Sequence, residues 1–81
     1  MIIRLNAAHD HCSLNRLELQ DSTFCGCFYC FAIFVPDEIS EWIDDGRTAV
    51  CPKCPVDAVI GSASGFPITP DFLDRMHDKW F

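Results

Sequence analysis

Two features are missing from this sequence: a long apolar stretch and a cluster of basic residues. The 81 residues include six Lys and Arg against twelve Asp and Glu, for a formal net charge of −6. No apolar run approaches the roughly 18 residues that a helix needs to cross a bilayer, and the N-terminus does not have the pattern of a signal peptide. We therefore expect a cytoplasmic protein that does not associate with membranes.

The shortage of basic residues also weighs against nucleic acid as a direct partner. A protein that binds DNA or RNA neutralises phosphates with a patch of Lys and Arg. Here the six basic residues are scattered along the chain. The acidic balance instead favours a basic protein as partner. The pattern indicates no particular oligomeric state.

Cysteine, by contrast, is abundant, with six in this short chain. A chain of this length buries too little surface for high stability, so an additional cross-link, either a disulfide or a bound metal, is expected. Two Cys-x-x-Cys pairs have the spacing of a tetrahedral four-cysteine zinc site, and in a reducing cytoplasm such pairs favour metal over disulfides. We predict one structural zinc ion, with four ligands: Cys27, Cys30, Cys51 and Cys54.

Cys25 is the ambiguous thiol, because it lies two residues before Cys27 and could in principle replace a ligand of the first pair. We prefer Cys27 with Cys30, since Cys-x-x-Cys builds the usual knuckle, in which backbone N–H groups point at sulfur. Cys25 is then a small buried apolar residue, a fifth thiol that exchanges with a ligand, or a reactive nucleophile.

The first twelve residues show no sustained period. We expect residues 1–12 to form a flexible lead and residues 13–81 to form a single domain. His9, Asp10, His11 and Cys12 crowd together in this lead, yet adjacent residues cannot easily share one tetrahedral ion. We expect only incidental metal affinity there.

The rest of the chain predicts short strands and helices. Ser13 can cap a short helix to about Gln20, whose Leu14 and Leu17 would face the zinc module. Residues 31–35 predict a buried strand, and 48–50 would pair with 58–60 as a hairpin across the second cysteine pair.

Two longer helices are also expected. Pro36, the apolar spacing of Ile39, Trp42 and Ile43, and Gly46 predict a central amphipathic helix over 36–45. Thr69-Pro70-Asp71 predicts the start of a C-terminal helix over about 70–80, which packs on the core through Phe72, Leu73, Met76 and Trp80. The expected fold is thus a small α+β, zinc-ribbon-like, metal-stapled domain with short β-hairpins, a central amphipathic helix and a C-terminal helix.

The predicted central helix carries acids on the face opposite its apolar stripe, with no Lys or Arg among them: Asp37, Glu38, Glu41, Asp44 and Asp45. These acids form either a solvated face that aids solubility or a docking surface for a basic partner. A second open case is the small-residue loop Gly61–Gly65, which is either a tight turn or a nest of backbone N–H groups for an anion.

The order and spacing of these motifs resemble a family of short bacterial cytoplasmic proteins with a predicted zinc ribbon. The resemblance covers about residues 13–81, and the segments that carry it include 25–30, 51–54, 59–68, Met76-His77 and Trp80-Phe81. It implies a zinc ribbon whose ligands are Cys27, Cys30, Cys51 and Cys54. The family has no assigned activity, so the resemblance implies fold, metal and compartment only.

One position departs from the family pattern, which has glycine after the second cysteine pair where this chain has Pro55. That glycine normally frees an N–H for a ligand sulfur, and proline has none. We expect either a slightly weaker zinc site or a hydrogen bond to sulfur from elsewhere.

Three functions fit this pattern, none of them enzymatic, because a site closed by four cysteines lacks the open position of a catalytic zinc and no catalytic constellation is found. The first is a protein-interaction module that meets a basic partner through its acidic helix. The alternative is a phage or mobile-element inhibitor that blocks the nucleic-acid-binding surface of a host protein. The second alternative is a nucleic-acid-binding zinc ribbon that uses the aromatic residues Phe28 and Tyr29.

Overall fold

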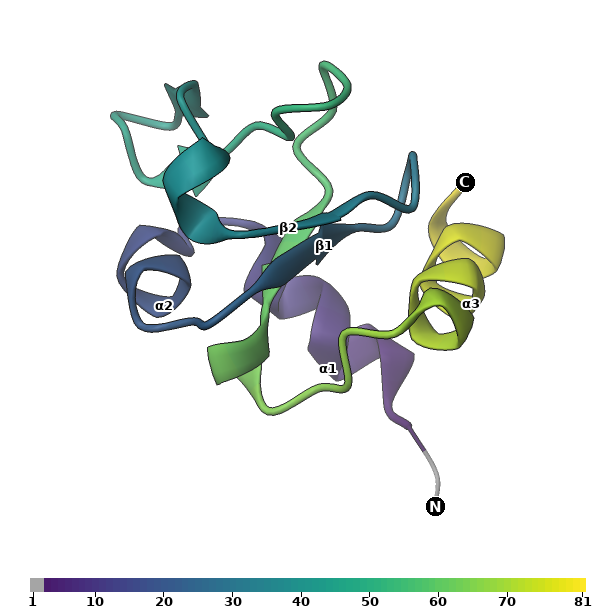
Figure 1. Cartoon of the computed structure of the whole chain (residues 1–81). Helices are drawn as coiled ribbons and strands as arrows, with labels where there is room; N and C mark the ends of the chain where they lie inside the picture. Colours follow the sequence, from purple (N-terminus) through teal and green to yellow (C-terminus); the bar gives the residue numbers. More distant parts are fainter. Residues whose placement is uncertain (1–2) are drawn as a thin grey trace.

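The structure is a computed structural model that describes residues 3–81, and within this range the chain forms a small α+β fold with two antiparallel sheets (Figure 1). The first sheet has the strand order β2-β1-β5, where β1 is Cys25–Cys27, β2 is Ile33–Phe34 and β5 is Val59–Gly61. The second sheet pairs β3 (Trp42–Ile43) with β4 (Thr48–Ala49). The expected fold class is confirmed.

The central strand β1 determines how the layers are arranged. Cys25 pairs with Gly61 of β5, and Gly26 pairs with Ile60. Because side chains alternate along a strand, Cys25, Cys27 and Gly61 face one side of the sheet, and Gly26 faces the other.

A helix packs on each side of this sheet (Figure 1). On the Gly61 side lies α2 (Arg16–Gln20), and a Cβ at Gly61 would fall 2.9 Å from the Leu19 side chain. On the Gly26 side lies α3 (Pro70–Trp80), and a Cβ at Gly26 would fall 3.0 Å from the Leu73 side chain. Glycine at these two positions lets the helices approach the sheet closely.

The two sheets are joined by the buried side chain of Asn15. Its Nδ2 donates to the Val59 carbonyl of β5 at 2.9 Å, and its Oδ1 accepts from the Ala49 N–H of β4 at 3.3 Å. The largest fully buried side chains of the described residues are apolar: Phe28, Phe72, Leu19, Ile60, Leu73 and Met76.

The C-terminal helix is confirmed. The Thr69 hydroxyl accepts the Phe72 N–H at 3.2 Å as the N-cap, and Pro70 occupies the first turn. Phe72, Leu73 and Met76 of the predicted apolar stripe are buried, but Trp80, its last member, is exposed, so the prediction is wrong for Trp80.

The predicted central helix over 36–45 is wrong. Only η2 (Pro36–Glu38) makes a 3₁₀ turn, after which Ile39 is extended and the chain enters β3. Asp44, Asp45 and Gly46 then take left-handed backbone conformations and reverse the chain into β4. An Asp-Asp-Gly sequence between apolar residues favours such a turn, because Asp and Gly tolerate positive φ. This turn signal, and not the apolar period, determines the local structure.

The predicted hairpin between 48–50 and 58–60 is also wrong. β4 pairs with β3, and β5 pairs with β1. The Phe28 N–H donates to the Ala58 carbonyl at 3.0 Å and extends the β1–β5 contact. A strand of two or three residues is too short to determine its partner by pattern alone.

The N-terminal segment contributes to the core in the structure. Residues Leu5–His9 form α1, Asp10–Cys12 form η1, and Ala8 and Cys12 are buried. This differs from the expectation of a flexible lead over 1–12, of which Met1 and Ile2 lie outside the described residues. The short helix α1 packs against α3.

The short helix after this segment begins later than expected. Leu14 has a φ of 50°, which is not helical, and α2 starts only at Arg16. Leu14 and Leu17 are exposed, so the prediction that they face the zinc module is wrong, and Leu19 takes the buried position. Within residues 3–81 no helix combines the length and the apolar character needed to cross a membrane.

Candidate metal centre

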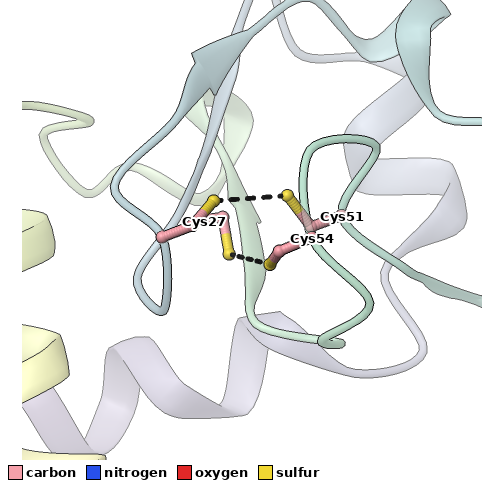
Figure 2. A group of neighbouring side chains, drawn as sticks. Cys27, Cys51 and Cys54 are labelled. Atoms are coloured by element: carbon pink, nitrogen blue, oxygen red, sulfur yellow. Dashed lines mark hydrogen bonds between the residues drawn. The ribbon is translucent and has the colours of Figure 1, made fainter.

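Two loops bring four cysteine sulfurs together, as Figure 2 shows for the labelled Cys27, Cys51 and Cys54. Cys27 ends β1 and Cys30 follows in the turn to β2; we call residues 27–32 the first knuckle. Cys51 and Cys54 lie between β4 and β5; we call residues 51–56 the second knuckle. The Sγ atoms of Cys27 and Cys54 are 3.7 Å apart, as are those of Cys30 and Cys51. All four sulfurs lie within 4.8 Å of one another.

This geometry fits one tetrahedral metal ion. With metal–sulfur bonds of about 2.3 Å, the edge of a tetrahedron of sulfurs is about 3.8 Å. Four soft thiolate donors suit zinc or iron and leave no position for a fifth ligand. Among the described residues this is the one group of three or more His, Cys, Asp or Glu side chains that could hold a metal, so His9, His11 and Cys12 do not form a second such site.

Backbone N–H groups point at the sulfurs in both knuckles. The Tyr29 N–H donates to Cys27 Sγ at 3.4 Å, and the Lys53 N–H donates to Cys51 Sγ at 3.3 Å. In each case the donor is two residues after the cysteine. Such bonds stabilise thiolate, the form that binds metal.

Backbone N–H groups also affect the pKa of the second cysteine of each pair. Burial opposes ionisation of Cys30, but the Ala32 N–H and the neighbouring sulfurs together lower its pKa. Burial raises the pKa of Cys54, and the backbone N–H of Val56 acts in the opposite direction. This effect of Val56 is in line with the second of the two expectations for Pro55, a donor from elsewhere.

The first ligand of the site is deeply buried. Cys27 is inaccessible to solvent, and this burial raises the pKa of its thiol above the usual range. A metal ion that bound here would displace a proton from this thiol, so its binding would release protons and weaken as the pH falls.

Cys25 stays outside the cluster. It is fully buried, and its Sγ lies 3.5 Å from the Phe34 carbonyl as a donor. Burial, with smaller effects of Cys51 and Glu38, raises the pKa of Cys25 to about 12. Two residues along a strand span about 6.7 Å, so Cys25 and Cys27 share a face without sharing a metal position. The structure thus places this possible alternate ligand beside the site as a protonated thiol.

The five acidic residues are all exposed, but they do not share a helix face. Asp37 and Glu38 lie in η2, Glu41 precedes β3, and Asp44 and Asp45 form the β3–β4 turn. Two of them have intramolecular partners. Glu38 accepts from Lys53 Nζ of the second knuckle at 2.8 Å, and Asp44 accepts from the Thr48 hydroxyl at 2.8 Å.

The loop Gly61–Gly65 uses its backbone N–H groups internally. Ser62 donates to the Phe24 carbonyl, Ala63 donates to the Ser22 hydroxyl, and Gly65 donates to the Ser62 carbonyl. A nest for an anion needs these same N–H groups. The loop is therefore a tight turn that contains η3 (Ser62–Ser64) and ends at Gly65 with a φ of 87°.

The aromatic residues of the first knuckle separate in the structure. Phe28 is buried in the core, whereas Tyr29 is exposed. The sequence alone did not indicate that Phe31, which has a φ of 68°, and the end of α3 lie beside Tyr29. The signal that could have found this group is the position of Phe31 directly after Cys30, where a knuckle commonly uses a residue with positive φ.

Comparison of the chain with family models, curated proteins and solved structures finds no match in any of the three. The four-cysteine cluster in a small α+β fold is therefore the feature from which a function must be argued.

Proposed function

We propose that this protein is a small acidic zinc-binding module that contacts a basic protein partner, and that one structural zinc ion holds its fold together. The observation that carries the proposal is the closed cluster of four sulfurs, which joins the first knuckle to the second. Binding free energies of structural zinc are of the same order as the stability of a small domain. The metal thus serves folding and leaves no open position for chemistry.

The contact surface in this proposal is the acidic segment, which we define as residues 37–45. Asp37, Glu41 and Asp45 are exposed members of this segment, and the whole chain carries a net charge of −6. Zinc with four thiolates adds a further local charge of about −2. Negative charges in this segment would speed the encounter with a basic surface and would repel an acidic one.

Native mass spectrometry of the protein isolated under mild conditions tests the metal and the partner together. We expect one zinc ion per chain and a bound protein of basic composition. One iron ion instead of zinc would overturn the choice of metal. A metal-free folded protein would overturn the whole proposal.

A set of neutralising substitutions then tests the contact surface. Asp37→Asn, Glu41→Gln and Asp45→Asn together should weaken binding of the partner found above. The matched control changes three exposed acids elsewhere, Asp10→Asn, Asp21→Asn and Asp57→Asn, and alters net charge equally. Equal weakening by both sets would show that only total charge matters and would contradict the surface.

Competition distinguishes the inhibitor alternative. If the partner is a nucleic-acid-binding protein and added DNA or RNA displaces our protein from it, the module acts as a blocker of that surface. Direct binding of nucleic acid at low salt would favour the second alternative over the proposal.

A further inference from the structure

Four aromatic rings meet where the first knuckle contacts the end of α3. The Tyr29 and Phe81 ring centroids are 4.9 Å apart, those of Phe31 and His77 are 5.0 Å apart, and those of His77 and Phe81 are 5.6 Å apart. We call Tyr29, Phe31, His77 and Phe81 the aromatic patch. The side chains of Tyr29, Phe31 and Phe81 remain 44%, 42% and 55% exposed although they touch one another or His77.

The backbone at Phe31 makes this exposure unusual. Its φ of 68° is left-handed, a conformation that glycine adopts freely and a bulky residue adopts at a cost. Glycine at this position would allow the same turn after Cys30 without strain. The chain instead holds a strained backbone and presents a large apolar side chain to water. Leu14 shares the positive φ and the exposure, but Phe31 in addition packs against the His77 ring, and this combination supports a binding role for the Phe31 side chain.

Two acidic residues of α3 lie close to the aromatic patch along the helix. Asp74 and Asp78 are exposed, Asp74 three residues before His77 and Asp78 three residues before Phe81. Cys30, a cysteine of the metal cluster, lies between Tyr29 and Phe31 in the chain and is only half-buried. On α3 the nearby Lys79 is directed elsewhere, with Nζ 5.5 Å from the Trp80 ring centroid.

We propose that the aromatic patch binds an arginine side chain of a basic protein segment. A guanidinium group is planar, stacks on the faces of Tyr and Phe, and is attracted to nearby carboxylates and to a thiolate-bound metal. Aromatic side chains in a contiguous exposed group are also typical of residues that carry binding energy. This inference rests on the proposed function, since it names a second contact for the same basic partner.

The test is a titration of the zinc-loaded, ¹⁵N-labelled protein with a nine-residue peptide that alternates Arg and Gly. We expect amide shifts at Tyr29, Phe31, His77 and Phe81. A peptide that alternates Lys and Gly should bind several-fold more weakly, because an ammonium group does not stack on a ring. Equal affinity of the two peptides would overturn the assignment of arginine.

Phe31→Gly separates binding from stability. It removes the ring and relieves the backbone, so we expect an unchanged or higher melting temperature, one bound zinc, and about a tenfold rise in the Kd of the Arg peptide. Leu14→Gly is the matched control, because Leu14 also has positive φ and is 65% exposed but lies outside the aromatic patch. It should leave the Kd unchanged. Phe81→Ala, at the end of α3, provides a second variant and should also raise the Kd.

The shift map separates failure of this inference from failure of the proposed function. Shifts confined to residues 37–45 would overturn the inference and leave the proposed function standing. Shifts at the aromatic patch alone would support the inference and contradict the acidic segment as the contact. No shifts at either would overturn both. Tighter binding of single-stranded oligothymidine at the same four amides would overturn the inference in favour of nucleic acid.

Discussion

Each knuckle supplies two sulfurs to the cluster, but the surroundings of the two knuckles differ. The first knuckle continues the sheet: the Cys27 N–H donates to the Ala32 carbonyl at 2.9 Å, and the Phe31 N–H donates to the Cys27 carbonyl at 2.8 Å. The second knuckle is an irregular loop between β4 and β5, with Pro52 next to its first cysteine. Cysteine spacing and the N–H groups two residues later are what the knuckles share. The other residues of the two loops differ between the knuckles.

The chain also leaves the two knuckles differently. After Cys30 the backbone passes through the left-handed conformation of Phe31, and that side chain points into the aromatic patch. After Cys54 the residue is Pro55, whose ring holds φ near −65° and excludes that conformation. The first knuckle therefore ends in an exposed aromatic side chain, whereas the second ends in a residue with a fixed φ.

Loss of one ligand tests whether the knuckles are equivalent at the metal. We expect Cys30→Ser and Cys51→Ser to unfold the protein alike, although Cys51 is buried and Cys30 is half-buried, because each supplies one of four ligands. Circular dichroism and metal stoichiometry measure this, and a chelator should have the same effect. Cys12→Ser, outside both knuckles, should keep one metal ion. A folded Cys51→Ser protein with one zinc would contradict the ligand set.

The stability of the protein at high pH tests a buried thiol outside both knuckles, that of Cys12. Burial, with a smaller effect of Asp57, raises the pKa of Cys12 from 9.0 to about 11. The folded protein therefore keeps a proton that the unfolded chain loses above pH 9, so stability falls as the pH rises from 9 to 11, by about 2 kcal/mol. Urea unfolding of Cys12→Ala at several pH values should show a shallower decline. An equal loss of stability in Cys12→Ala and in the unchanged protein would contradict a raised pKa at Cys12.

A methyl group added at Gly26 tests how closely α3 packs against β1. Gly26→Ala places a methyl group 3.0 Å from the Ile68 and Leu73 side chains, and should lower the free energy of unfolding by about 1–2 kcal/mol. Thermal or urea unfolding measures the change. In a Leu73→Val background the same substitution should cost less, because the crowding δ-methyl groups are absent. Equal costs in both backgrounds would show that α3 does not crowd the strand.

Pro55→Gly tests the second knuckle and should have the smallest effect. It adds an N–H next to Cys54, where the backbone of Val56 already acts to lower the pKa of the thiol. We expect unchanged zinc affinity in a competition with a chromogenic chelator, and a loss of about 0.5–1 kcal/mol of stability from the freer unfolded chain. A clear gain in zinc affinity would mean that Cys54 lacks a donor in the native protein.

Local signals in the sequence predicted well where one short segment contains the whole cause. The cap at Thr69 and the spacing of Phe72, Leu73 and Met76 predicted α3 with its start and its buried face. The two Cys-x-x-Cys pairs predicted the cysteines that the structure brings together, and the metal identity stays a prediction. Such features depend on contacts within a few residues, which the order of residues alone specifies.

Local signals failed where two of them competed. The apolar spacing of Ile39, Trp42 and Ile43 fits a helix, yet the same residues fit a buried position followed by a short strand. The turn at Asp44, Asp45 and Gly46 decides the outcome, because it allows β3 to pair with β4. The acids of the segment consequently surround a turn instead of lining a helix.

By itself the sequence determined that two cysteine pairs can share one metal, that a helix follows Thr69, and that the chain is acidic. The tertiary structure decided which two- and three-residue strands pair, that Cys25 lies outside the cluster, and that Tyr29, Phe31, His77 and Phe81 form one patch. The physical reason is distance along the chain. Pairing and packing between remote segments depend on how all the short elements fit together around β1, and no single stretch contains that information.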